Sequence, residues 1–224
     1  HGLECSENFS LSVPKCADIL ASYGPLIKRE LGKLDSDNPE VLNIGSPRFD
    51  QYRNEIISEK AKNNLRKKLN INAQHPVLLY VATDIVLGQT YDTYSMLQLF
   101  KNIAAAISHT EGLQVIIKIR PGPATENFFK QSPREVFGEK CRIAQYENIH
   151  ELISISDVVT SSFSTVILEA MIVEKPLILV GLDKNDRMLI ESHFLPYEQA
   201  QALRIARTKE ELAQYVRSVI MNPD

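Results

Sequence analysis

A turn rich in hydroxyl groups follows a short apolar stretch in the segment from Asp157 to Val180. The pattern predicts a strand, this turn, a helix and a second strand. The first N–H groups of a helix lack intrahelical partners, so such a turn is a natural site for an anion. Glu169 lies about one helical turn further on, where its carboxylate could reach a polyol beside that anion. Phosphate next to ribose is what a nucleotide diphosphate presents. The hydroxyl residues of the turn are Thr160, Ser161, Ser162, Ser164 and Thr165.

The same residues have a plainer interpretation, which the sequence leaves open. Serine and threonine are favoured N-caps, so the turn could simply begin a helix in any α/β protein. Glu169 could then be structural, in a salt bridge to Lys175 or Lys118.

Lys118 and Arg120 end another predicted strand, and their alternation points both side chains to the same side of it. Cations at the end of a buried strand are costly unless they meet carboxylates or phosphates. Arg120 is therefore a candidate phosphate ligand. The alternative is an ion pair with Glu126 or Glu147.

Three more candidates follow predicted strands. Arg48 stands in the segment 45–50, Gly-Ser-Pro-Arg-Phe-Asp, where a strand gives way to a helix. It could meet an anion or be a surface arginine. Thr83 ends a strand and could contact phosphate or an acceptor. Backbone groups near Tyr146 could hold a base ring, although a packed aromatic at a strand end is the stronger interpretation.

Short apolar segments alternate with helical patterns, which predicts an α/β fold: a Rossmann-like open parallel sheet with helices on both faces. In such a sheet, ligands bind beyond the carboxyl ends of the strands. The candidate strands are Ala17–Ser22, Val41–Gly45, Val77–Ala82, Val115–Ile119, Arg142–Gln145, Val158–Thr160, Leu177–Val180 and Leu203–Ala206. The candidate helices are Pro25–Gly32, Asp50–Leu69, Tyr91–Ser108, Thr125–Val136, Ile149–Ser154, Ser164–Val173, Asn185–Ser192 and Lys209–Met221.

Composition narrows the class of protein. The chain has 224 residues and a net charge of −3, with 44% hydrophobic residues, enough to bury a sizeable core. The basic cluster at 60–68 is interleaved with leucines, as in a solvated amphipathic helix, so we expect no nucleic-acid partner. No apolar run approaches the ~18 residues of a membrane span, and the first residues do not resemble a signal peptide. No histidine or cysteine has metal-ligand spacing, so we expect no metal site. The cysteines, Cys5, Cys16 and Cys141, fit a reduced, cytoplasmic protein.

An ordered set of motifs, taken together, resembles the C-terminal, nucleotide-binding half of GT-B-type glycosyltransferases. The nearest group is that of surface and capsule polysaccharide synthesis, close to the CDP-glycerol glycerophosphotransferases and the UDP-N-acetylglucosamine 2-epimerases. The motifs are His1-Gly2, Tyr23-Gly24, the Gly-x-Pro-Arg-x-Asp turn at 45–50, Lys118 to Pro121, and the run from the Ser/Thr turn through Glu169-Ala170 to Lys175-Pro176.

The resemblance implies a single nucleotide-sugar-binding domain over residues 1–224, without the N-terminal acceptor-binding domain. It implies metal-free transfer of a glycosyl or polyol-phosphate group to a glycan hydroxyl, with a nucleotide-sugar donor of the UDP or CMP/CDP type and no other cofactor. The isolated domain would be inactive. His1 is the candidate catalytic residue. The resemblance to this group of enzymes also allows peripheral association of the full-length enzyme with a membrane.

Two departures from the family pattern bear on mechanism. The family's Lys-x-His-Pro has Arg120 in place of histidine, which keeps a phosphate contact but loses a titratable group. Ser161 stands eight residues before Glu169, where many retaining enzymes carry an acid, so that branch is disfavoured. The alternatives are a UDP-sugar 2-epimerase half and a non-catalytic α/β binding module.

Overall fold

A computed structural model describes residues 18–22, 39–54, 56–82, 93–119, 129 and 132–222. The chain divides into two compact units, residues 1–56 and 57–224. The expectation of a single domain over 1–224 stays a prediction.

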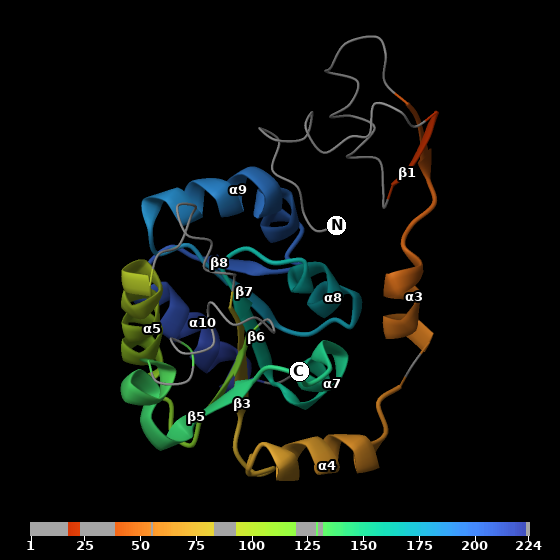
Figure 1. Ribbon diagram of the computed structural model, residues 1–224. Coiled ribbons are helices and arrows are strands. Elements are labelled where there is room, and N and C mark those ends of the chain that lie inside the picture. Colours follow the sequence, from red (N-terminus) through yellow and green to blue (C-terminus); the bar gives the residue numbers. More distant parts are fainter. Residues whose placement is uncertain are drawn as a thin grey trace. The chain divides into compact units, whose positions relative to one another are not determined.

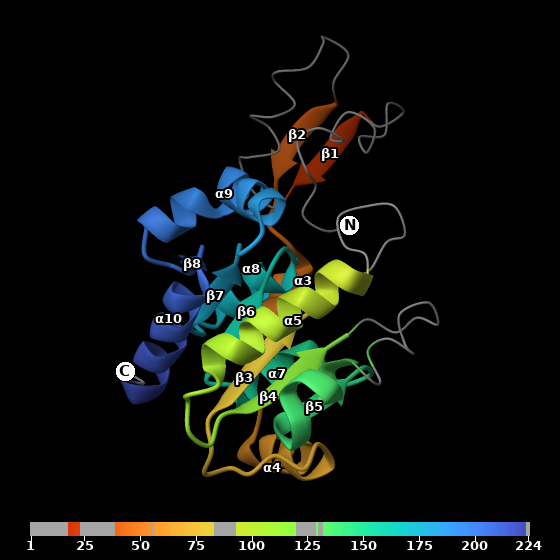
Figure 2. The same ribbon diagram turned by 90° about the vertical axis from the view of Figure 1, so that its left-hand side faces the viewer.

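The second unit is built on a six-stranded sheet in the order β5-β4-β3-β6-β7-β8, and every neighbouring pair is parallel (Figures 1 and 2). The predicted parallel sheet is confirmed. Its strands are β3 (Val77–Val81), β4 (Gln114–Lys118), β5 (Cys141–Ala144), β6 (Val158–Ser161), β7 (Leu177–Val180) and β8 (Arg204–Ala206).

Helices cover both faces of this sheet, as the apolar, non-alternating strands require. Figure 1 shows α5 and α10 on one face and α7 and α8 on the other. The helices of this unit with described bounds are α4 (Glu59–Lys68), α5 (Thr93–Ile107), α7 (Ile149–Ile155), α8 (Val166–Ile172), α9 (Lys184–Gln199) and α10 (Lys209–Met221), with a 3-10 turn, η2, at Gly138–Lys140.

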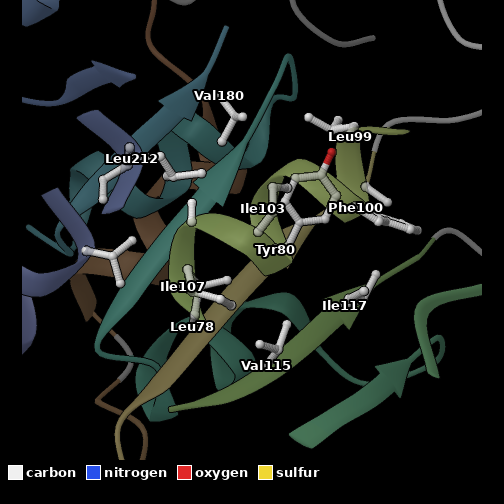
Figure 3. Packing of buried hydrophobic residues seen from close by; sticks show 14 of the residues in the cluster. Leu78, Tyr80, Leu99, Phe100, Ile103, Ile107, Val115, Ile117, Val180 and Leu212 are labelled. Carbon is white, nitrogen blue, oxygen red and sulfur yellow. The ribbon is translucent and has the colours of Figure 1, made fainter. Parts of the chain in front are cut away.

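The main core lies between the sheet and the helices α5 and α10. Figure 3 shows how alternate residues of β3, such as Leu78 and Tyr80, meet Phe100 and Ile103 of α5. The Tyr80 ring stands edge-on to that of Phe100, with 5.8 Å between ring centroids. This geometry is favourable for aromatic pairs and fixes the ring.

The first unit holds a two-stranded parallel sheet of β1 (Ile19–Ser22) and β2 (Glu40–Asn43), followed by α3 (Pro47–Asn54). The sequence pattern predicted both strands but not that they pair with each other, apart from the six-stranded sheet. Most residues of β1 and β2 are exposed, in contrast to the fully buried strand β3.

Two predicted helix boundaries are wrong. The helix expected over Asp50–Leu69 is two helices, because the Ser58 side chain accepts a hydrogen bond from the Ala61 N–H and starts α4 anew. The helix expected to end at Ser192 continues through Pro196 to Gln199. Burial of Phe194 stabilises this extension, and proline removes only one helical N–H. The candidate helix Pro25–Gly32 lies outside the described residues.

Candidate functional site

The sheet has its topological switch point between β3 and β6. The chain runs outward from β3 through β4 to β5, then returns to place β6 against the other side of β3. In an open α/β sheet, the crevice beyond the carboxyl ends of the strands at such a point is where ligands bind. The hydroxyl-rich turn follows β6 at this point, since Val81 and Ser161 are paired at the carboxyl ends of the two strands.

Two hydroxyl groups of this segment are structural. The Thr160 hydroxyl donates to the Leu79 carbonyl at 3.3 Å, and the Ser161 hydroxyl donates to the Val81 carbonyl at 3.0 Å. Both side chains are buried and tie β6 to β3.

The next hydroxyl groups belong to the turn itself. The Ser164 hydroxyl accepts a hydrogen bond of 3.3 Å from the Val166 N–H and thereby caps α8. Thr165 occupies the N-cap position, and its side chain makes no capping bond. Ser162 is buried, and its hydroxyl has no partner within the described part of the chain.

The turn also presents backbone donors. Among the described residues, no acceptor faces the N–H groups of Ser162, Ser164 and Thr165. Unpaired N–H groups that precede a helix suit an anion, because they donate without the cost of a fixed charge. The turn therefore has the backbone donors that the sequence predicted. Some of its hydroxyl groups bond the protein itself, and others have no such partner among the described residues.

An aromatic residue at the centre of the turn packs against α9. The Phe163 ring lies 5.3 Å from the His193 ring and 5.8 Å from the Phe194 ring, both edge-on. The imidazole of His193 is held in turn by the Leu189 carbonyl, 3.0 Å from its Nδ1 atom. The position of α9 thus fixes the course of the turn, which the sequence analysis missed because the partners are some 30 residues apart (163 against 193 and 194).

Glu169 lies in the first turn of α8 and is fully buried. The ammonium groups proposed as its structural partners have other acceptors. Lys175 donates to the Ser156 carbonyl, and Lys118 donates to the carbonyls of Ile119 and Gln145.

Lys118 stands at the carboxyl end of β4, as predicted, but it binds backbone carbonyls there. Burial lowers the pKa of its ammonium group, and the nearby Glu147 carboxylate opposes that shift. Glu147 itself pairs with Lys68, at 3.0 Å between Nζ and Oε1. Tyr146, beyond β5, is 76% exposed, so it is not the packed aromatic of the plainer interpretation. Its role toward a base stays a prediction.

For four of the predicted site residues, the structure describes either nothing or the backbone alone. His1, Thr83 and Arg120 are outside the described residues, and of Arg48 only the backbone, in α3, is described. The structure therefore brings Ser162, Ser164, Thr165 and Glu169 together in one turn and helix, and the roles of the other residues stay predictions.

Arg187, which no sequence motif indicated, also lies at this edge of the sheet. Arg187 donates from Nε to the Gly181 carbonyl after β7, and from Nη2 to the Arg207 carbonyl after β8. Asp183 caps α9 by accepting a hydrogen bond of 2.8 Å from the Asn185 N–H.

A shallow pocket of about 460 Å³ lies at the opposite, amino-terminal edge, where β3, β4 and β5 begin. Its polar groups are committed to the fold. The Arg142 guanidinium donates to the carbonyls of Leu69, Asn70 and Glu139, and Gln114 bonds the backbone of Asn72. This pocket is not where the predicted site residues meet.

No group of three or more His, Cys, Asp or Glu residues that could hold a metal ion occurs within the described ranges. Within the same ranges, none of the helices has both the length and the apolar character needed to cross a bilayer.

The parallel six-stranded sheet, the helices on both faces and the turn at the switch point define a Rossmann-like domain of the GT-B kind. Solved structures with this fold include a variant of the wall teichoic acid polymerase TagF soaked with CDPG. It is 20% identical, with a TM-score of 0.59 over 91% of this chain and 47% of that one. A UDP-N-acetylglucosamine 2-epimerase is 16% identical, with a TM-score of 0.60 over 93% of this chain and 50% of the other.

The chain belongs to the CDP-Glycerol:Poly(glycerophosphate) glycerophosphotransferase family, whose model matches residues 33–223. The resemblance drawn from the sequence motifs is thereby confirmed. Among curated proteins, the teichoic acid ribitol-phosphate polymerase TarL of Staphylococcus aureus (strain NCTC 8325 / PS 47) is 21% identical over 158 residues. That match covers 70% of this chain and 28% of TarL, so the chain spans less than a third of that relative.

Proposed function

We propose that this chain is the donor-binding part of a glycosyltransferase-type enzyme of cell-surface polymer synthesis. Its donor would be a nucleotide diphosphate linked to a polyol, of the CDP-glycerol kind, and its acceptor a hydroxyl of the growing polymer. The observation that carries the proposal is the family match across residues 33–223. The turn at the switch point supports it, because it offers backbone donors where this fold binds ligands.

In this proposal the diphosphate lies against the N–H groups and the side-chain hydroxyl groups of Ser162, Ser164 and Thr165. The Glu169 carboxylate accepts hydrogen bonds from the ribose hydroxyls. Binding to Glu169 requires a movement that opens access to it, since its side chain is fully buried. The residues proposed to complete the site are Arg48, Thr83, Arg120 and Tyr146 for the nucleotide and His1 for acid–base chemistry.

The chemistry proposed for a CDP-polyol donor is attack of the acceptor hydroxyl oxygen on the β-phosphorus. The bond between that phosphorus and the bridging oxygen breaks, the hydroxyl proton passes to a base, and CMP leaves with the electron pair. N–H groups and arginines directed at the phosphates stabilise the charge that develops on the leaving group. We propose that no metal is required, that the enzyme acts on the cytoplasmic side, and that it associates peripherally with a membrane.

A UDP-sugar 2-epimerase is the second candidate, and the fold shared with such an enzyme at a TM-score of 0.60 favours it. The two candidates differ in the base they accept. A non-catalytic module that keeps the fold would bind neither donor.

Calorimetric titration of the chain with CDP-glycerol, CDP, UDP and UDP-N-acetylglucosamine tests the proposal. We expect binding of the cytidine compounds and weaker binding of the uridine compounds. The reverse order would favour the epimerase, and no binding of any of the four would refute a donor site in this chain.

The position of the site is tested by the double variant Ser164→Ala/Thr165→Ala. We expect its affinity for CDP-glycerol to fall by about five- to tenfold, as loss of hydrogen bonds near a charged ligand implies. Ser108→Ala is the matched control, because it removes an exposed hydroxyl at the far end of α5, which donates only to the Ala105 carbonyl. Equal affinity in the double variant and the control would place the anion elsewhere.

A further inference from the structure

Tyr80 and Ser162 each bury a hydroxyl group that lacks a hydrogen-bond partner within the described residues. An unpaired buried polar group costs about 1–3 kcal/mol, so native proteins retain few of them without a reason. The proposed function uses Ser162 and leaves Tyr80 unexplained.

The sheet brings these two side chains to the same place. Tyr80 is paired with Thr160 in the register of β3 and β6, and Ser162 lies two residues further along. Residues two apart on a strand share a face, and a long aromatic side chain reaches the diagonal neighbour on the next strand. Tyr80 therefore reaches from the core toward the underside of the turn.

The surroundings of Tyr80 keep its hydroxyl a donor. Burial raises the pKa of Tyr80, the Ser162 hydroxyl acts in the opposite direction, and the Asp186 carboxylate adds to the rise. The phenol stays protonated at any physiological pH. Contact with Phe100 holds the ring, which leaves the oxygen little freedom to find another partner.

A hydroxyl group offers one donor and two acceptor positions. When the Tyr80 hydroxyl donates to Ser162 Oγ, the serine keeps its own proton for a second acceptor. When two hydroxyl groups donate in sequence to a charged acceptor, both hydrogen bonds become stronger, because each bond polarises the next. The second acceptor available at the turn is an oxygen of the phosphate bound there.

We propose that Tyr80 is a positioning residue, which donates to Ser162 Oγ from beneath the turn and so directs the Ser162 proton to an oxygen of the bound diphosphate. This inference rests on the proposed function. In this arrangement Tyr80 contributes to the binding of the anion although it lies in the core and does not touch the ligand.

The test is a double-mutant cycle with Tyr80→Phe and Ser162→Ala, with CDP-glycerol and CDP as probes and calorimetry as the readout. We expect about a fivefold loss of affinity for Tyr80→Phe and about tenfold for Ser162→Ala. The double variant should bind no more weakly than Ser162→Ala alone, because the tyrosine acts only through the serine.

Ser156→Ala is the matched control. It removes another buried hydroxyl, bonded to the Leu152 carbonyl, just before the opposite end of β6. It should lower the melting temperature and leave affinity unchanged, whereas Tyr80→Phe should lower affinity without lowering the melting temperature.

Three results would overturn the inference while the wild-type chain binds the probes: additive losses in the cycle, wild-type affinity in Tyr80→Phe, or loss of the fold in Tyr80→Phe. The last would give the hydroxyl a structural role. If the wild-type chain binds neither probe, the proposed function itself fails and the inference fails with it.

Discussion

A cluster of charges holds α9 to the carboxyl end of β8, and it gives a sharp stability prediction. Arg207 follows β8 and pairs with two glutamates of α9, at 2.7 Å from Nε to Glu191 and 2.7 Å from Nη2 to Glu198. Its Nη1 atom makes a second contact with Glu198, at 2.9 Å. Because α9 also packs on Phe163, this cluster supports the candidate site indirectly.

The proposed change is Arg207→Met, which keeps much of the aliphatic stem and removes the charge. The three side chains are 28%, 34% and 23% exposed for Arg207, Glu191 and Glu198, so solvent screens the pairs in part. Pairs of this kind contribute roughly 0.2–1 kcal/mol each, and short bidentate contacts lie at the upper end. Loss of the arginine also leaves two carboxylates without a countercharge. We expect the free energy of unfolding to fall by about 2 kcal/mol, or about 4–8 °C in melting temperature for a unit of this size.

The dependence on pH has a defined sign. The hydrogen bond from Arg207 is the main cause that holds the pKa of Glu198 below its usual value. A carboxyl group with a lower pKa in the folded state stabilises the fold above its unfolded pKa of about 4.3, and that contribution is lost as pH falls through the folded value. The difference between Arg207→Met and the wild type should therefore be full at pH 7 and shrink below about pH 4.

Thermal unfolding followed by circular dichroism at pH 7 and pH 3.5 measures both effects. The control is Arg204→Met in β8, because Arg204 is exposed and, among the described residues, contacts Ser218 Oγ and the Tyr215 ring. The control should lose less than about 1 kcal/mol, as for other surface substitutions. Equal melting temperatures for the two variants, or a difference from wild type that does not change with pH, would refute the reasoning.

Two further outcomes are expected. Glu169→Gln should weaken binding of CDP-glycerol by ten- to a hundredfold, from loss of a charged hydrogen bond of about 1.5–3 kcal/mol; glutamine avoids the cavity that alanine would leave at this buried position. Unchanged affinity with lower stability would make Glu169 structural. Burial raises the pKa of the Cys141 thiol to about 12. Alkylation of this thiol at pH 8, followed by peptide mass spectrometry, should therefore be at least about a hundredfold slower in the native than in the unfolded chain. Equal rates would show that Cys141 is accessible.

The sequence predicted much of the local structure, because the signals are carried by neighbours along the chain. Runs such as Val77–Val81 and Leu177–Val180 are apolar on both faces, which only a covered parallel sheet accommodates. Serine and threonine before an apolar helical pattern predicted the start of α8, where the Ser164 hydroxyl accepts from the Val166 N–H. The place of the hydroxyl-rich turn, after a strand and before a helix, followed from the same reasoning.

Helix ends were harder to predict where local signals compete. The pattern over Asp50–Leu69 contains no proline or glycine, yet Ser58 begins a new helix because its side chain offers the backbone an alternative acceptor. The helix expected to end at Ser192 continues through Pro196, because burial of Phe194 compensates for the helical hydrogen bond that proline removes.

By itself, the sequence determined the class of fold, the family motifs and the position of the turn, since each depends on residue types a few positions apart. Tertiary structure alone decided which hydroxyl groups of that turn are available. Thr160 and Ser161 donate to carbonyls of β3 that lie 81 and 80 residues away, whereas the buried Ser162 hydroxyl has no partner among the described residues. The reason is physical: a hydroxyl group takes whichever acceptor the fold brings within about 3 Å, and for a residue at a strand end that acceptor belongs to the neighbouring strand.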